Sequence, residues 1–317
     1  MSWPATAPAL PGWAKLWRSG MDEGVRDGLG DVNALASELI RRRYSCRTYR
    51  PEPIGEVERR RLTDYMAGRT AGPLGARARF ALVAAAPGDA SALKRLGTYG
   101  FIKGATGFIV GAVRRAPNDL EDYGYLLEQI VLSATDLGLG TCWLGGTFTR
   151  SSFVRRFGGL ARDETLPAVV SIGLIGDDGA ERIREREEGS RRLPSSQTFF
   201  ERGFGETLDL SRVGVYAEAL AAVRMAPSAT NKQPWRIVRD GAAWHFYLRR
   251  TKGYGKGSAL FTVLRIVDLQ RVDMGIAMCH FELVAGERGL TGSWVVRDPG
   301  IPLPGNDTAY TVTWVAE

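Results

Sequence analysis

The stretch Asp122–Leu144 reads DYGYLLEQIVLSATDLGLGTCWL, and the stretch Asp273–Val295 reads DMGIAMCHFELVAGERGLTGSWV. Aligned without gaps at a shift of 151, the two stretches share seven of 23 residues, among them an early Asp and Gly and a late Gly-Leu pair and Trp. In both, apolar residues recur at helical spacing up to the Gly-Leu pair, and a short strand follows. Self-similarity at a fixed shift indicates an internal repeat. We therefore predict two tandem copies of one α+β unit.

The flanking sequence predicts similar elements in each half. In the first half we expect helices over Asp31–Arg42, Glu56–Ala67 and Asp119–Leu137, and strands over Arg79–Ala85 and Pro167–Ile175. In the second half we expect helices near Arg212–Arg224 and Asp268–Arg288, and strands near Pro234–Arg239, Trp244–Leu248, Ser293–Val296 and Thr308–Val315. We expect residues 1–30 to form an irregular arm, 31–193 the first half and 194–317 the second, with a charged connector over Asp177–Arg192. Two similar units tend to pair about a two-fold axis, so one chain forms a pseudo-dimer.

Composition excludes several classes of protein. The chain has 317 residues, 44% hydrophobic and 24% charged, which is typical of a soluble globular protein. We expect no membrane segment, because no apolar run reaches about 18 residues, and no signal peptide. Three cysteines and two histidines lack metal-ligand spacing, so we expect no disulfide framework, no metal site and a reducing cytoplasm. The net charge is +7, but no nucleic-acid motif accompanies it, so we expect no nucleic-acid partner.

Three segments carry residues suited to binding a ligand. Arg43-Tyr-Ser-Cys-Arg47 places a hydroxyl between two guanidiniums, which can bind phosphate or a planar acceptor edge. Pro227-Ser-Ala-Thr-Asn-Lys-Gln-Pro-Trp235 places short polar groups on a constrained loop. Gly138-Leu-Gly-Thr-Cys-Trp-Leu-Gly-Gly146 offers bare backbone N–H donors. Each segment also has a purely structural explanation. The first can be a basic helix end, the second a turn whose own side chains bind its backbone groups, and the third a helix cap. We expect His280 to be a satisfied core or interface histidine.

Together the three segments resemble the motifs of the nitroreductase family of flavin enzymes, over roughly residues 32–317. The resemblance is closest to its internally duplicated branch, the TM nitroreductase group. It implies a nitroreductase-like α+β fold and FMN as cofactor. It also implies hydride transfer from NAD(P)H, as a transient electron donor, through flavin N5 to a small electron-poor acceptor of nitroaromatic or quinone type. No side chain is then a catalytic acid or base, because the flavin carries the chemistry.

The resemblance also implies roles for residues of this chain. Arg43 and Arg192, or Arg191 in its place, bind the FMN phosphate, and Arg47 faces the N1/O2 edge of the ring. The backbone N–H of Gly145 or Gly146 points at N5. The remaining cofactor-binding residues that it implies are Tyr44, Ser45 and Leu144 in the first half and Pro227, Ser228, Asn231 and Gln233 in the second.

The two halves depart from the family in complementary ways. Where the first half should carry the Pro-Ser loop, it reads Ala71-Gly-Pro-Leu-Gly-Ala-Arg77, and the second half has no Ser-x-Arg motif over Phe199–Asp209. We therefore predict one complete flavin site for each chain and a monomer. Two alternatives remain open. One is a different flavin enzyme on the same fold, of dehydrogenase, deiodinase or flavin-cleaving type, and the other is a flavin- or ligand-binding module without turnover.

Overall fold

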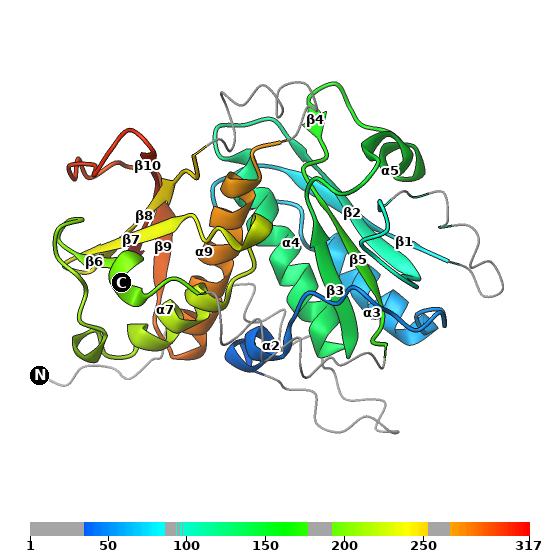
Figure 1. The fold of residues 1–317 in the computed structure, drawn as a ribbon, viewed down its shortest axis with the longest axis horizontal. Helices are drawn as coiled ribbons and strands as arrows, with labels where there is room; N and C mark the ends of the chain where they lie inside the picture. Colours follow the sequence, from blue (N-terminus) through cyan, green and yellow to red (C-terminus); the bar gives the residue numbers. More distant parts are fainter. Residues whose placement is uncertain (1–34, 86–92, 94–95, 97, 177–191, 253–266) are drawn as a thin grey trace, which may run out of the picture. The chain divides into compact units, whose positions relative to one another are not determined.

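The computed structural model describes residues 35–85, 93, 96, 98–176, 192–252 and 267–317 (Figure 1). Leu35–Glu317 form one compact unit. The expected N-terminal arm, the connector up to Arg191 and the start of the first expected helix lie outside the described residues. The boundary between the halves near residue 193 therefore stays a prediction.

The first half contains a sheet whose main path runs β1-β2-β5-β3, with antiparallel pairing throughout. Its strands are β1 (Ala78–Ala84), β2 (Gly107–Arg114), β3 (Leu139–Leu144) and β5 (Val169–Leu174), and the two-residue β4 (Glu164–Thr165) pairs with β2. Its helices are α2 (Ala36–Arg42), α3 (Glu56–Ala67), α4 (Asp119–Asp136) and α5 (Arg150–Arg156). Strands β2 and β5 are apolar and buried along nearly their whole length, because helices and loops cover both faces of the sheet.

The second half repeats this arrangement. Its sheet runs β6-β7-β8-β10-β9, and all pairs except β6 with β7 are antiparallel. Its strands are β6 (Phe199–Glu201), β7 (Trp235–Asp240), β8 (Ala243–Arg249), β9 (Gly292–Val295) and β10 (Thr308–Ala316), and its helices are α7 (Tyr216–Met225) and α9 (Leu269–Glu287). Short 3-10 turns cover Ser195–Gln197, Leu210–Arg212 and Ala229–Asn231. The order β7-β8-β10-β9 matches β1-β2-β5-β3 in chain order and in pairing, as the sequence repeat predicts.

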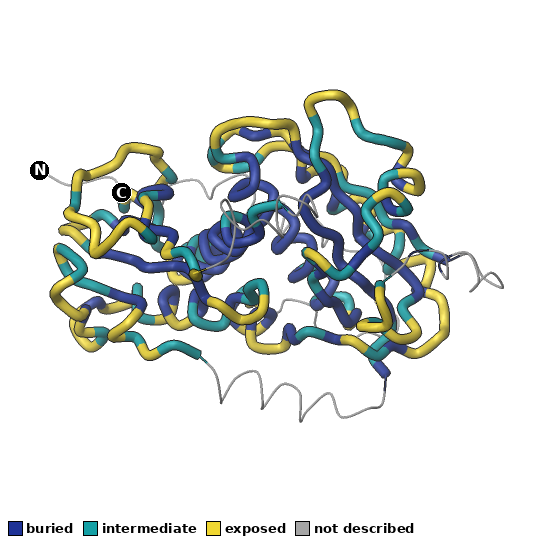
Figure 2. Tube along the Cα trace, turned by 45° about the horizontal axis from the view of Figure 1, so that its top comes forward, coloured by how far each residue is buried: buried dark blue, intermediate teal, exposed yellow. Residues whose placement is uncertain are grey.

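Helices α4 and α9 pack against each other between the two sheets (Figure 1). Each helix contacts the sheet of its own half, α4 through β2 and β3 and α9 through β7 and β8. Both helices are buried along nearly their whole length, as Figure 2 shows. Burial on several sides explains why both helices carry apolar residues beyond one narrow stripe. The layers of the unit are therefore sheet, helix, helix and sheet. The core helices form the largest part of the contact between the halves, and α2 adds contacts with α7 and α9.

Most elements lie where the sequence places them, with ends shifted by a few residues. The apolar run Phe108–Val113, which the sequence leaves open between a short strand and a buried turn, forms most of β2. The clearest misses are α5 and β6. Helix α5 has seven residues, three of them arginines, and a single buried residue, Phe153, so it shows no helical periodicity. Strand β6 has three residues and depends on its pairing with β7, which a local sequence pattern cannot reveal.

Candidate functional site

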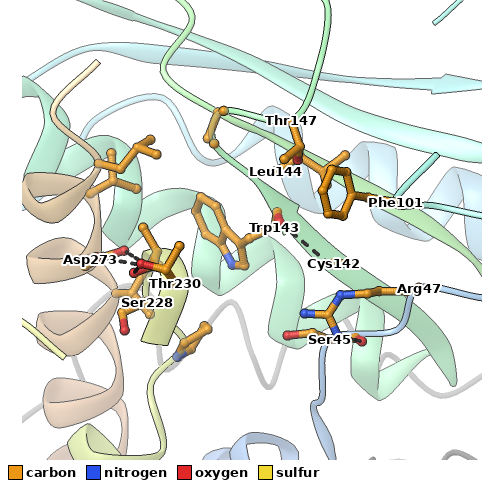
Figure 3. A pocket seen from close by; sticks show the side chains of 18 of the residues that line it. Ser45, Arg47, Phe101, Cys142, Trp143, Leu144, Thr147, Ser228, Thr230 and Asp273 are labelled. Carbon is orange, nitrogen blue, oxygen red and sulfur yellow. Dashed lines mark hydrogen bonds between the residues drawn. The ribbon is translucent and has the colours of Figure 1, made fainter. Parts of the chain in front are cut away.

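One cavity of about 380 Å³ lies between the halves and is lined by both (Figure 3). The first half contributes Ser45, Arg47, Phe101, Ile102, Cys142, Trp143, Leu144, Gly145, Gly146, Thr147 and Ala168. The second half contributes Pro227, Ser228, Ala229, Thr230, Leu269, Val272, Asp273 and Ile276. Each of the three segments singled out by the sequence reaches this cavity. The structure thus brings together residues that lie more than 180 positions apart in the chain.

The arginine segment reaches the cavity because it runs along the edge of β3. After α2 ends at Arg42, Ser45 bridges Thr141 in parallel, and the Cys46 amide donates to the Thr141 carbonyl at 2.9 Å. This pairing sets Ser45 and Arg47 on the cavity wall, where the Arg47 guanidinium donates to the Ser45 carbonyl at 3.3 Å. Arg47 is exposed and brings a positive charge to the cavity.

The glycine segment follows β3 directly. A side chain at Gly145 would overlap Leu269 of α9, so this glycine allows the two halves to approach closely. A Cβ at Gly146 would meet no atom within 4 Å. The backbone beside the cavity is therefore bare at Gly146, which leaves its amide approachable by a ligand.

The Pro-Ser loop forms the opposite wall and is held in an unusual conformation. Thr230, Asn231 and Gln233 have φ values of 50°, 55° and 49°, in the left-handed region that non-glycine residues seldom adopt. The Gln233 amide donates to the Ser228 hydroxyl at 2.9 Å. Such strain persists only where the surroundings hold it, and it gathers at ligand sites.

Asp273 of α9 holds the Pro-Ser loop in place by a hydrogen bond to its backbone. Its two carboxylate oxygens accept from the Ala229 amide at 3.0 and 3.1 Å. Burial raises the pKa of Asp273 well above its ordinary value, and the hydrogen bond from Ala229 opposes the rise. Asp122, its counterpart at a shift of 151, accepts from the Leu74 and Ala76 amides at 2.9 and 2.7 Å. The two aspartates therefore perform the same structural task in the two halves, and only Asp273 also lines the cavity.

Several residues of the expected site lie off the cavity wall. Tyr44 is buried in a small cluster with Cys46 and Tyr49. The Arg43 side chain is 4% exposed, and its Nε lies 3.8 Å from a carboxylate oxygen of Glu128. The buried Nε of Arg43 has no hydrogen-bond partner among the described residues.

The polar residues at the end of the Pro-Ser loop also turn away from the cavity. Gln233 is buried, accepts from the Leu193 amide at 2.8 Å and donates to the Asn231 carbonyl at 3.1 Å. Arg192 donates to the Ala226 and Met225 carbonyls at 2.7 and 3.0 Å and to the Asn231 side chain at 3.3 Å. In this structure Gln233 and Arg192 fasten the loop to the chain that precedes the second half. Arg191 lies outside the described residues.

Sequence reasoning missed other residues of the wall, chiefly Trp143, Phe101 and Asp273. Trp143 and Asp273 are both identical between the repeated stretches, and this identity was the available signal. Phe101 is 57% exposed and reaches the cavity from the chain between β1 and β2, where no sequence pattern marks it.

Across the described ranges we find no group of three or more metal-ligating side chains. No helix within those ranges is long and apolar enough to span a membrane.

Comparisons with known proteins agree with this architecture. The family model described as "Putative TM nitroreductase" matches residues 36–285. A Thermotoga maritima structure described as a "putative nitroreductase" aligns with 92% of this chain and 99% of its own, with a TM-score of 0.57 and 19% identity, which shows the same fold. A search of the curated proteins gives no match.

Shorter structures align with about half of the chain. A nitroreductase family protein from Clostridium difficile covers 52% of this chain and 95% of its own, with 18% identity and a TM-score of 0.39. A nitroreductase with bound FMN from Bacteroides fragilis covers 46% and 91%, with 17% identity and a TM-score of 0.35. The match of the family model over most of the chain, on a repeated α+β fold with one cavity lined by both halves, identifies this chain as a member of the TM nitroreductase family.

Proposed function

We propose that the chain is an FMN-dependent oxidoreductase and that the cavity between the halves holds the flavin. The observation that carries the proposal is the convergence of all three motif segments on one cavity, with Ser45 and Arg47, Gly145 and Gly146, and Ser228 on its walls. The resemblance of these segments to nitroreductase motifs implies the same cofactor. Because each half supplies only one wall, the site depends on both halves of a single chain, which supports a monomer with one FMN.

The residues present fit this cofactor. A cavity of about 380 Å³ lies within the range of about 300–1,000 Å³ that small-molecule sites occupy. Its walls include the apolar side chains of Trp143, Leu269 and Ile276, which suit a flat ring. Arg47, which lines the cavity, brings a positive charge that suits an anionic ligand, whereas Arg43 lies off the wall with the Glu128 carboxylate 3.8 Å from its Nε.

When bound, FMN supplies a ring that accepts a hydride and passes it to an acceptor. The Arg47 guanidinium would stabilise negative charge at the ring, by preorganised electrostatics in a partly enclosed site. The Gly145 and Gly146 amides carry no side chain of their own, and the space beside Gly146 is open, while Leu269 fills the space beside Gly145. The resemblance assigns Ser228 and Asn231 to the flavin from the second half, and Arg43 and Arg192, or Arg191, to the phosphate. Ser228 lines the cavity as the structure stands, whereas Asn231, Arg43 and Arg192 lie off its wall and would have to turn toward the ligand.

We further propose NADH or NADPH as transient donor and a small, flat, electron-poor acceptor such as a nitroaromatic or a quinone. The mostly apolar wall and the exposed Phe101 ring beside it support a flat apolar acceptor. The sequence carries no dinucleotide-binding fingerprint, which supports a nicotinamide that binds and leaves.

The test is to purify the chain, record its visible spectrum and quantify the FMN released for each chain. We expect close to one FMN for each chain and bleaching of the flavin by NADH or NADPH under anaerobic conditions. A protein that neither carries nor takes up FMN would overturn the proposal. Bound FMN that neither nicotinamide reduces would leave the cofactor assigned and overturn the nicotinamide step.

A further inference from the structure

Trp143 and Trp294 occupy equivalent positions of the repeat but different surroundings. Trp294 lies among aromatic rings of the second half, with centroids 5.1 Å from Phe246 and 5.1 Å from Trp314. No aromatic ring among the described residues contacts Trp143, and its strand neighbour on β5 is Val170. The Trp143 indole instead stands in the cavity wall, between the Pro-Ser loop and Arg47 (Figure 3). Its ring face is thus available to a flat ligand.

A buried pair of side chains holds this indole in place. The Trp143 Nε1–H donates to one carboxylate oxygen of Glu128 at 2.8 Å. The other oxygen of Glu128 lies 3.0 Å from Nε2 of His280. Both side chains of the pair are 0% exposed, Glu128 on α4 and His280 on α9. One residue from each half therefore contributes to fixing a single cavity side chain.

The groups that contact Glu128 and His280 determine which of their atoms carry hydrogens. Nδ1 of His280 lies 2.9 Å from the Ala222 carbonyl, which can only accept, so Nδ1 carries a hydrogen. The contact between Nε2 and the carboxylate then requires one more hydrogen, on either atom, because two lone pairs would otherwise face each other. Either placement leaves the second carboxylate oxygen to accept from Trp143. With Arg43 beside it, the buried cluster carries one net positive charge in both cases.

We propose that Glu128 and His280 are positioning residues that hold the Trp143 indole as the surface on which the flat ligand of the cavity packs. This inference rests on the proposed function in one respect, that the ligand is FMN. The repeat itself points to a specialised role. The counterpart Trp294 also donates to a glutamate, Glu282, at 2.7 Å, yet its ring packs against Phe246, Phe281 and Trp314. Both halves have a hydrogen bond from Trp to Glu, but of the two tryptophans only Trp143 lines the cavity.

The test is FMN titration of the full chain freed of flavin, followed by flavin fluorescence and by quenching of tryptophan fluorescence. We expect Trp143→Leu to weaken FMN binding about tenfold, through loss of an aromatic contact. Glu128→Ala should weaken binding about fivefold, because the indole loses its partner. Glu128→Gln should stay within about twofold of wild type, since its amide N–H donates to Nε2 while its oxygen accepts from Trp143.

Glu282→Ala is the control, because it removes the Trp–Glu hydrogen bond of the other half, along with the bond from Tyr125, and should leave FMN affinity unchanged. Glu282 lies three positions beyond the counterpart of Glu128, so the two hydrogen bonds are similar in kind and not in position. If wild type fails to bind FMN, the proposed function falls. If wild type binds and Trp143→Leu binds equally well, the positioning role is overturned while the proposed function stands. A Glu128→Gln variant that is folded and as weak as Glu128→Ala would also overturn it. Trp143→Leu and Glu128→Gln decide the matter should Glu128→Ala not fold.

Discussion

Gly124 of α4 and Gly275 of α9 face each other's backbones where the two core helices cross. A Cβ at Gly124 would overlap the Val272 carbonyl, and a Cβ at Gly275 would overlap the Glu121 carbonyl. Gly124 and Gly275 are 151 positions apart, and so are Glu121 and Val272. The contact is therefore symmetric, as in a dimer of identical subunits. The absence of side chains at both glycines is what lets the halves approach closely enough to share a cavity.

Gly275→Ala should therefore weaken the association of the halves. The new methyl group would meet backbone atoms, which cannot move aside as a flexible side chain can. We expect the free energy of unfolding to fall by about 3 kcal/mol, at the upper end of overpacking effects. Urea denaturation followed by circular dichroism measures the change. Gly205→Ala is the control, because a Cβ there meets nothing within 4 Å, and it should be neutral. Equal stability of the two variants would contradict the symmetric contact.

The repeat made much of the fold predictable, because its identical positions have the same tasks in both halves. Gly138 and Gly289 end the core helices with φ values of 74° and 77°. Trp143 and Trp294 each donate to a glutamate of a core helix. The strand order could not be read from the sequence, because pairing between distant strands leaves no local pattern. The structure supplied the order, and the repeat explains why the two sheets agree.

Asp122 should make stability depend on pH. Burial raises its pKa from the ordinary 3.8 to about 6, although two backbone amides oppose the rise. Between these values the folded chain binds more protons than the unfolded chain, so its stability falls as pH rises. The fall totals about 3 kcal/mol over the whole titration, and about 2 kcal/mol of it occurs between pH 4 and pH 6. Asp122→Asn removes this titration, and its loss of one acceptor adds an offset that does not depend on pH. Denaturation of both proteins at several pH values measures the difference, and parallel curves would contradict the prediction.

Arg47 should contribute to FMN affinity through charge-assisted hydrogen bonding. We expect Arg47→Ala to weaken FMN binding by about 2 kcal/mol, or about thirtyfold. Arg47→Lys should recover part of the loss, because it keeps the charge and lacks the planar fork. Flavin fluorescence titration gives each dissociation constant. Arg50→Ala is the control, since Arg50 is exposed, pairs with Glu52 at 4.0 Å and does not line the cavity. Unchanged affinity in Arg47→Ala would remove Arg47 from the site.

The candidate site was predictable only in part. Ser45, Arg47, Gly145, Gly146 and Ser228 carry motif positions and do line the cavity. A motif states which residues recur and not which way each side chain turns. The direction depends on the local backbone, and the left-handed conformations from Thr230 onward were not visible in the sequence.

Gln233 tests whether the motif or the observed contacts describe this loop better. Its buried amide accepts from Leu193 and donates to the Asn231 carbonyl, so Gln233→Ala leaves buried groups without partners. We expect the free energy of unfolding to fall by about 2 kcal/mol, with little change in FMN affinity once the variant is folded. Lys232→Ala, at an exposed neighbour, should change neither quantity. Denaturation and flavin titration on the same samples separate the two effects. A large loss of FMN affinity at unchanged stability would instead make Gln233 a flavin ligand, as the resemblance implies.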